Sequence, residues 1–120
     1  MRIAVSAQGE SLDALTSEVF GRAPTLIFVD TDTLAFEALS NPAMTQGGGA
    51  GTSAAQFVIS RGAEAVLSGT FGPNAVEVFD AAGVPLYQTP SCTVRQAIDM
   101  LKTWRLRRLE KPGRPFWPNR

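Results

Sequence analysis

The sequence contains no histidine and only one cysteine, Cys92, among its 120 residues. One thiol cannot form a disulfide within these residues, and no zinc site built from cysteine and histidine can be assembled. Catalysis by a Ser-His-Asp or Cys-His arrangement, or by a histidine general base, is excluded for the same reason. Any metal that this chain binds must therefore be held in another way.

Long apolar runs are also missing, and none approaches the roughly 18 residues that a membrane-spanning helix requires. Apolar residues make up 44% of the chain and the mean hydropathy is +0.02, values typical of a globular protein. The segment from Met1 to Ser6 lacks the apolar region of a signal peptide, so we expect a cytoplasmic protein with no membrane partner. The length fits a single domain with its own core.

Charge is distributed unevenly along the chain. Residues 1 to 101 carry four basic and ten acidic residues, whereas residues 102 to 120 carry seven basic residues and only Glu110. We therefore predict a domain over residues 1–103, followed by a basic tail over 104–120 that contains both tryptophans and three of the prolines. The tail either packs on the domain or on a second subunit, as in a homodimer, or it contacts an acidic partner or nucleic acid. The acidic domain disfavours nucleic acid.

Hydrophobic periodicity predicts an α/β arrangement. Strands are expected at residues 3–5, 25–30, 34–39, 64–68 and 84–87, the second and third of which form a hairpin. Helices are expected from Ser53, from Pro73 and from Thr93, and the first and third of these begin with the spacing of a capping box. Because helix and strand alternate in the second half, we expect parallel strands with helices packed on the sheet.

A glycine run at residues 47–51 leads into the first of these helices. Glycine permits a close approach of the backbone to a ligand, and the first N–H groups of a helix have no intrahelical partner and attract anions. The lysine of a nucleotide-binding P-loop is missing, so the expected ligand is an anion other than a nucleoside triphosphate. A second glycine turn at residues 69–74 also leads into a helix, and the two turns could converge on one anion. The alternative is a pair of flexible loops without a ligand.

Candidate binding residues come from these turns and from the loop after the first strand, because ligands of α/β proteins bind at the carboxyl ends of the strands. They are Ser6, Gln8, Gly47, Gly48, Gly49, Gly51, Thr52, Ser53, Thr70, Phe71, Gly72 and Asn74.

Two further residues have a binding and a structural interpretation. Arg22 either offers its forked donors to an oxyanion or sulfide-rich ligand, or neutralises Glu18 or Asp30. Cys92 precedes a helix, where it is either a metal ligand with a lowered pKa or an inert, partly buried thiol.

Short motifs are spread along residues 1–103 in a defined order. They are Met1-Arg2-Ile3-Ala4-Val5, Ser17-Glu18-Val19-Phe20-Gly21-Arg22-Ala23-Pro24, Asn41-Pro42-Ala43, Gly47-Gly48-Gly49-Ala50-Gly51 with Ala54-Ala55-Gln56, Gly69 with Gly72-Pro73-Asn74-Ala75, Ala81-Ala82-Gly83-Val84, and Thr93-Val94 with Ala97. In these motifs the chain resembles the dinitrogenase iron–molybdenum cofactor biosynthesis family, which includes NifX, the carboxyl-terminal part of NifB and the orange protein of sulfate reducers.

The resemblance implies a ribonuclease-H-like, three-layer α/β/α fold with a mixed five-stranded sheet and no enzymatic activity. It implies that the protein binds, stores or carries an anionic metal–sulfur cluster, with cluster donor or acceptor proteins as partners. Many relatives have Ser-Glu-His-Phe-Gly, where this chain has Val19 in the histidine's place, so no histidine ligand is carried over. A noncovalently held cluster is then expected, of the molybdenum–copper sulfide type or an iron–molybdenum cofactor precursor.

A regulatory or interaction module that binds a phosphorylated metabolite or a protein partner is the alternative function. The absence of the histidine favours this alternative, and the two glycine turns favour cluster binding.

Overall fold

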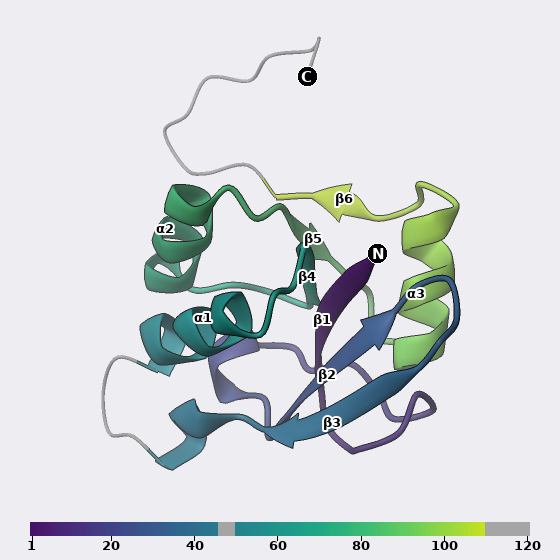
Figure 1. The fold of residues 1–120 in the computed structure, drawn as a ribbon, viewed down its shortest axis with the longest axis horizontal. Helices are drawn as coiled ribbons and strands as arrows, with labels where there is room; N and C mark the ends of the chain where they lie inside the picture. The colour runs from purple at the N-terminus through teal and green to yellow at the C-terminus, as the bar shows by residue number, and fades with distance from the viewer. Residues whose placement is uncertain (46–49, 110–120) are drawn as a thin grey trace, which may run out of the picture.

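The computed structural model describes residues 1–45 and 50–109, which form one mixed sheet with helices on both faces (Figure 1). The strands are β1 (Arg2–Ala7), β2 (Thr25–Asp30), β3 (Phe36–Ser40), β4 (Ala65–Ser68), β5 (Leu86–Gln88) and β6 (Arg107–Arg108). The α-helices are α1 (Ala50–Ser60), α2 (Pro73–Ala82) and α3 (Val94–Lys102), and the 3-10 helices are η1 (Phe20–Arg22) and η2 (Pro42–Thr45).

The strand order is β3-β2-β1-β4-β5-β6. β1, β4 and β5 run parallel, β2 and β3 form the predicted antiparallel hairpin, and β6 pairs antiparallel with β5. Because the three central strands are parallel, the loops that leave β1, β4 and β5 emerge at one edge of the sheet. This edge is where ligands of open α/β sheets bind.

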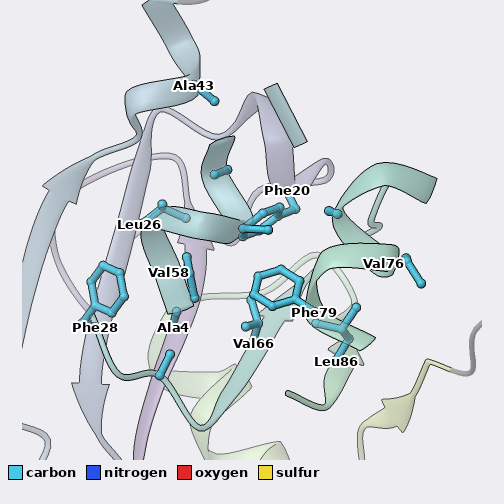
Figure 2. Packing of buried hydrophobic residues seen from close by; sticks show 14 residues of the cluster. Ala4, Phe20, Leu26, Phe28, Ala43, Val58, Val66, Val76, Phe79 and Leu86 are labelled. Atoms are coloured by element: carbon cyan, nitrogen blue, oxygen red, sulfur yellow. The ribbon is translucent and has the colours of Figure 1, made fainter. Parts of the chain in front are cut away.

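The two faces of the sheet bury different hydrophobic clusters because successive strand residues point to opposite sides. Ala4, Leu26 and Val66 pack on the face covered by α1 and α2, together with Phe20, Val58 and Phe79 (Figure 2). Ile3, Ile27 and Leu67 pack on the other face against Val94, Ala97 and Ile98 of α3. The result is the predicted layering of helices, sheet and helix.

Local signals located α2 and α3 correctly. α2 begins at Pro73 and is followed by Gly83, whose φ of 74° is the left-handed conformation that favours glycine. The predicted capping box of α3 is present: the Gln96 amide donates to the Thr93 hydroxyl over 3.1 Å, and the Thr93 amide donates to the Gln96 side chain over 2.9 Å.

Two expectations were wrong. α1 begins at Ala50, so Ser53 is inside its first turn and does not cap the helix. The reason is tertiary packing, since the backbone of Gly51 lies between η1 and α2, and a local capping pattern does not register such contacts. The sheet also has a sixth strand, β6, whose two residues carry no hydrophobic alternation.

The structure does not test three of the predictions about fold and domain organisation. The ribonuclease-H-like designation and the domain boundary at residue 103 stay predictions, and the structure continues through β6 to Leu109. The expected tail residues 110–120 lie outside the described residues. Within the described parts of the chain, no helix is both long and apolar enough to cross a bilayer.

Candidate anion-binding site

The segment from Ser17 to Phe20 lies across the carboxyl ends of β1 and β4 and is fixed there by backbone hydrogen bonds. The Ser17 amide donates to the Ser6 carbonyl over 2.9 Å, and the Ser17 carbonyl accepts from the Gly69 amide over 3.0 Å. The Phe20 amide donates to the Thr70 carbonyl over 3.0 Å. This ladder of hydrogen bonds brings the segment so close to Gly69 that a side chain is excluded there, because a Cβ would lie 2.7 Å from the Glu18 carbonyl oxygen.

The first turns of α1 and α2 meet beside η1. A Cβ on Gly51 would lie 3.4 Å from the Ala75 amide nitrogen, and one on Gly21 would lie 3.3 Å from the Gly51 amide nitrogen. In α2 the first intrahelical bond runs from the Val76 amide to the Gly72 carbonyl, so the N–H groups of Asn74 and Ala75 have no intrahelical acceptor. The first turns of α1 and α2, which carry the positive ends of the helix dipoles, therefore lie against each other and against η1, which ends at Arg22. That the two glycine turns bind one anion stays a prediction.

Arg22 is the last residue of η1. Arg2 and Arg61 both pair with Glu37, at 3.0 and 3.4 Å, and Arg95 pairs with Asp13 at 3.3 Å. Arg22 is exposed and has no ion pair among residues 1–45 and 50–109. Its predicted structural alternative, neutralisation of Glu18 or Asp30, is not seen within these ranges.

Asp30 is instead satisfied by its own turn. Its carboxylate accepts from the amides of Asp32 and Thr33 over 2.8 and 3.1 Å, and the bonds from Thr33 and Asp32 hold its pKa below the usual range. Turn chemistry therefore explains Asp30.

Two hollows of about 370 Å³ each flank the segment from Ser17 to Val19. One is lined by this segment together with Gln8 and Arg22. The other is lined by the same segment and by the loops after β4 and β5, including Thr70 and Ser91. Glu18, which is exposed, borders both hollows and places one negative charge beside them, including the hollow that Arg22 lines.

Several predicted donors are already used inside the protein. Ser6 is fully buried, and its hydroxyl donates to the Ser68 hydroxyl over 2.7 Å. The Thr70 hydroxyl donates to the Glu18 carbonyl over 2.7 Å. A hydroxyl has one proton to donate, so neither Ser6 nor Thr70 can give a hydrogen bond to a ligand in this arrangement.

Several of the other predicted residues belong to the first turns of α1 and α2 or to the turn before α2. Gly51, Thr52 and Ser53 are in the first turn of α1, and Gly72 is the N-cap of α2 with Asn74 exposed beside it. The Phe71 ring packs against Phe20, with ring centroids 5.5 Å apart. Gln8 donates to the Thr16 carbonyl and borders the same hollow as Arg22. Gly47, Gly48 and Gly49 lie outside the described residues.

Cys92 is not brought to this junction. It belongs to the hydrophobic cluster under α3, on the opposite face of the sheet from α1 and α2. Burial raises the pKa of its thiol, although a hydrogen bond with the Thr16 side chain acts in the other direction. The described residues also contain no group of three or more histidine, cysteine, aspartate or glutamate side chains that could hold a metal ion.

Sequence reasoning missed the role of Ser17, Glu18 and Val19 at the site. They were noted as part of a motif but not as lining residues, because their position depends on the long-range ladder to β1 and to Gly69 and Thr70. Gly69, which cannot carry a side chain at this crossing, was the signal that pointed to it.

Comparison with known proteins identifies the family. The model of the family described as dinitrogenase iron-molybdenum cofactor matches residues 1–103. The chain belongs to this family. The resemblance inferred from the motifs is thereby confirmed.

Several solved structures share the fold of this chain. The apo form of the orange protein from Desulfovibrio gigas is 38% identical, with a TM-score of 0.87 and coverage of 94% of this chain and 96% of that chain. A putative NifB protein from Thermotoga is 32% identical, with a TM-score of 0.76 and coverage of 88% and 90%. A putative dinitrogenase from Methanocaldococcus jannaschii, 15% identical with a TM-score of 0.71 and coverage of 93% and 97%, shows the fold alone. No curated protein sequence matches the chain significantly.

The crossing of the 17–20 segment over Gly69 is testable by stability. Gly69→Ala should lower the free energy of unfolding by about 1–3 kcal/mol, because its Cβ would press on the Glu18 backbone, which cannot move without breaking the ladder. Gly72→Ala is the matched control, since a Cβ there meets nothing within 4 Å, and it should cost less than about 1 kcal/mol. Urea denaturation followed by circular dichroism measures both. Equal stability of the two variants would contradict the crossing.

Proposed function

We propose that the protein binds and carries an anionic metal–sulfur cluster, without catalysing a reaction, at the junction of η1 with the first turns of α1 and α2. The observation that carries this proposal is the packing of the first turns of α1 and α2 against η1, the short helix that ends at Arg22, whose guanidinium has no ion pair among the described residues. Family membership and the 38% identity to the orange protein support the same cargo class. Donor and acceptor proteins for the cluster are the partners that such a role requires.

The donor set suits a cargo that is bound through its sulfides. Backbone N–H groups and a guanidinium donate hydrogen bonds and cannot ligate a metal, and bonds to an anionic acceptor are the stronger, charge-assisted kind. A cluster whose metals are already coordinated by sulfide presents such acceptors on its surface. The protein would then hold the cluster as an intact anion, with the helix dipoles offsetting part of its charge.

Val19 favours a particular kind of cargo. It is 39% exposed and borders both hollows, at the position where the family motif commonly has histidine. An exposed valine offers no ligand to a metal with an open coordination position, whereas it can contact a sulfide-covered surface. We therefore assign a cluster of the molybdenum–copper sulfide type ahead of an iron–molybdenum cofactor precursor. The glycines at 47–49 stay predicted contributors of further amides.

Arg22→Gln tests the site directly. Apo protein is titrated under anaerobic conditions with tetrathiomolybdate and Cu(I), and uptake is followed by visible absorption and by the metal retained after desalting. Loss of a charge-assisted hydrogen bond should weaken binding by about ten-fold or more, or about 1.5 kcal/mol. Arg61→Gln is the control, because Arg61 follows the far end of α1, about 15 Å from its first turn, and pairs with Glu37. It should bind as the wild type does.

The same titration separates the alternatives. No uptake by the wild-type protein, or equal uptake by Arg22→Gln and wild type, would contradict the proposed site. Binding of inorganic phosphate in preference to thiomolybdate would instead favour the phosphorylated-metabolite alternative.

Glu18→Gln should change affinity in the opposite direction. Glu18 has no ion pair within the described ranges and borders both hollows, so its charge repels an incoming anion. Removing one charge a few ångströms from the ligand should strengthen binding about three- to ten-fold at low salt, and the gain should shrink as salt rises. Glu64→Gln is the control, because the Glu64 carboxylate accepts from the Arg2 amide at the start of β1, the opposite end of the sheet. Weaker binding by Glu18→Gln would show that the anion lies elsewhere.

A further inference from the structure

Trp104 occupies an unfavourable position for its side chain. It is 89% exposed, and its φ of 60° is in the left-handed region, where glycine is the usual residue after a helix. The turn that imposes this conformation closes α3: the Trp104 amide donates to the Leu101 carbonyl over 3.2 Å, and the Arg105 amide donates to the Met100 carbonyl over 2.8 Å. Within the described residues, no contact of the indole compensates for its exposure or for the backbone strain at Trp104.

The turn is also fixed in place. The Arg105 guanidinium donates to the Thr103 hydroxyl and to the Asp99 carboxylate, both over 2.9 Å. These bonds attach the turn to the last part of α3. The Trp104 side chain consequently projects from a turn that hydrogen bonds hold against α3.

A groove of about 640 Å³ runs along the outer face of α3, from Ser91 and Cys92 at one end to Arg105 at the other. Arg95 and Met100 also line it. A guanidinium attracts the face of an indole ring, and a thioether packs favourably against an aromatic ring. The groove therefore has the size and chemistry to receive a tryptophan side chain.

The two ends of α3 carry unpaired charges of opposite sign. β6 follows the carboxyl end of α3 (Figure 1). Its Arg107 and Arg108 are exposed and have no ion pair among the described residues. At the amino end of α3, the loop of residues 8–15 presents Glu10, which is exposed and likewise has no ion pair in those ranges. That loop is fastened to the helix, because the Arg95 amide donates to the Leu12 carbonyl over 2.8 Å.

We infer that the outer face of α3 is a docking surface for a second copy of this chain. The two copies pair about a two-fold axis with their α3 helices antiparallel, so that the same patch on each copy contacts the other. α3 has nine residues and is about 13 Å long, so an axis near its middle places Trp104 over the Ser91–Arg95 end of the partner's groove. The same arrangement brings Arg107 and Arg108 of each copy to Glu10 of the partner subunit.

Charge complementarity favours a second copy docked on α3 over a dimer in which the β6 edge strands of two copies pair. Side-by-side antiparallel pairing of two β6 strands would bring the four arginines of the two copies together, which is unfavourable. The antiparallel α3 arrangement instead places the Trp104 indole of each copy in the groove of the other and brings Arg107 and Arg108 of each copy to the Glu10 carboxylate of the other.

The oligomeric state of Trp104→Gly is the first test. Sedimentation equilibrium of the full chain should give a dimer for the wild type and a monomer for Trp104→Gly. Because glycine suits the left-handed conformation, the unfolding midpoint of this variant should be no lower than that of the dissociated wild type. A wild type that is monomeric up to about 1 mM, or a Trp104→Gly variant that stays dimeric, would overturn the proposal.

Charge reversal provides a second test that is independent of the indole. Arg107→Glu with Arg108→Glu in one variant, and Glu10→Arg in another, should each be monomeric, because like charges then face each other twice. An equimolar mixture of the two variants should form a heterodimer, because opposite charges face each other again. If the mixture stays monomeric while both variants keep their circular dichroism, the proposed pairing is wrong.

Other partners would give a different result in fluorescence. In a Trp117→Phe protein Trp104 is the only tryptophan, and tryptophan emission, excited selectively over tyrosine, should shift to shorter wavelength as protein concentration rises through the dimerisation range. A shift caused by poly-L-glutamate or by a single-stranded oligodeoxynucleotide, at concentrations where the protein is monomeric, would assign the surface to that partner and overturn self-docking.

Discussion

The candidate site depends on one close crossing of backbone over backbone. The Ser17–Phe20 segment passes so near Gly69 that any side chain there would meet the Glu18 carbonyl. The hydrogen bonds along this crossing hold η1 against the first turns of α1 and α2, where Gly21 and Gly51 also approach closely. Without the crossing, η1, which ends at Arg22, would not be held against these helix N-termini. The absence of a side chain at Gly21, Gly51 and Gly69 thus allows the close backbone contacts on which the site depends.

The same crossing explains why the site is chemically simple. It buries Ser6 and Ser68 and uses the Thr70 hydroxyl, so the side-chain donors that remain near the junction are few. The Arg22 guanidinium and the amides of the two helix ends favour negative charge and offer no metal ligand. Glu18 and Arg22 line the same hollow, and the negative charge of Glu18 would favour the release of a bound anion in the proposed function.

The sequence predicted the helices whose ends depend on local interactions, but not the features that depend on contacts between distant residues. Pro73 and Gly83 bracket α2, and Thr93 with Gln96 begins α3, because these residues act through their own backbone and near neighbours. The start of α1 was misplaced because Gly51 is set by packing against Gly21 and Ala75. The lining role of Glu18 and Val19 depends on pairing with residues about fifty positions away. No local pattern encodes such a contact.

The central claim is that the cargo is an anionic metal–sulfur cluster, and native protein tests it most directly. The protein is purified anaerobically from its own source without reconstitution, and its visible spectrum and its molybdenum, copper, iron and sulfide contents are measured. The account predicts a coloured protein with visible absorption bands and with molybdenum and sulfide in stoichiometric proportion to the chain. Colourless protein that lacks both, isolated under the same conditions, would contradict it.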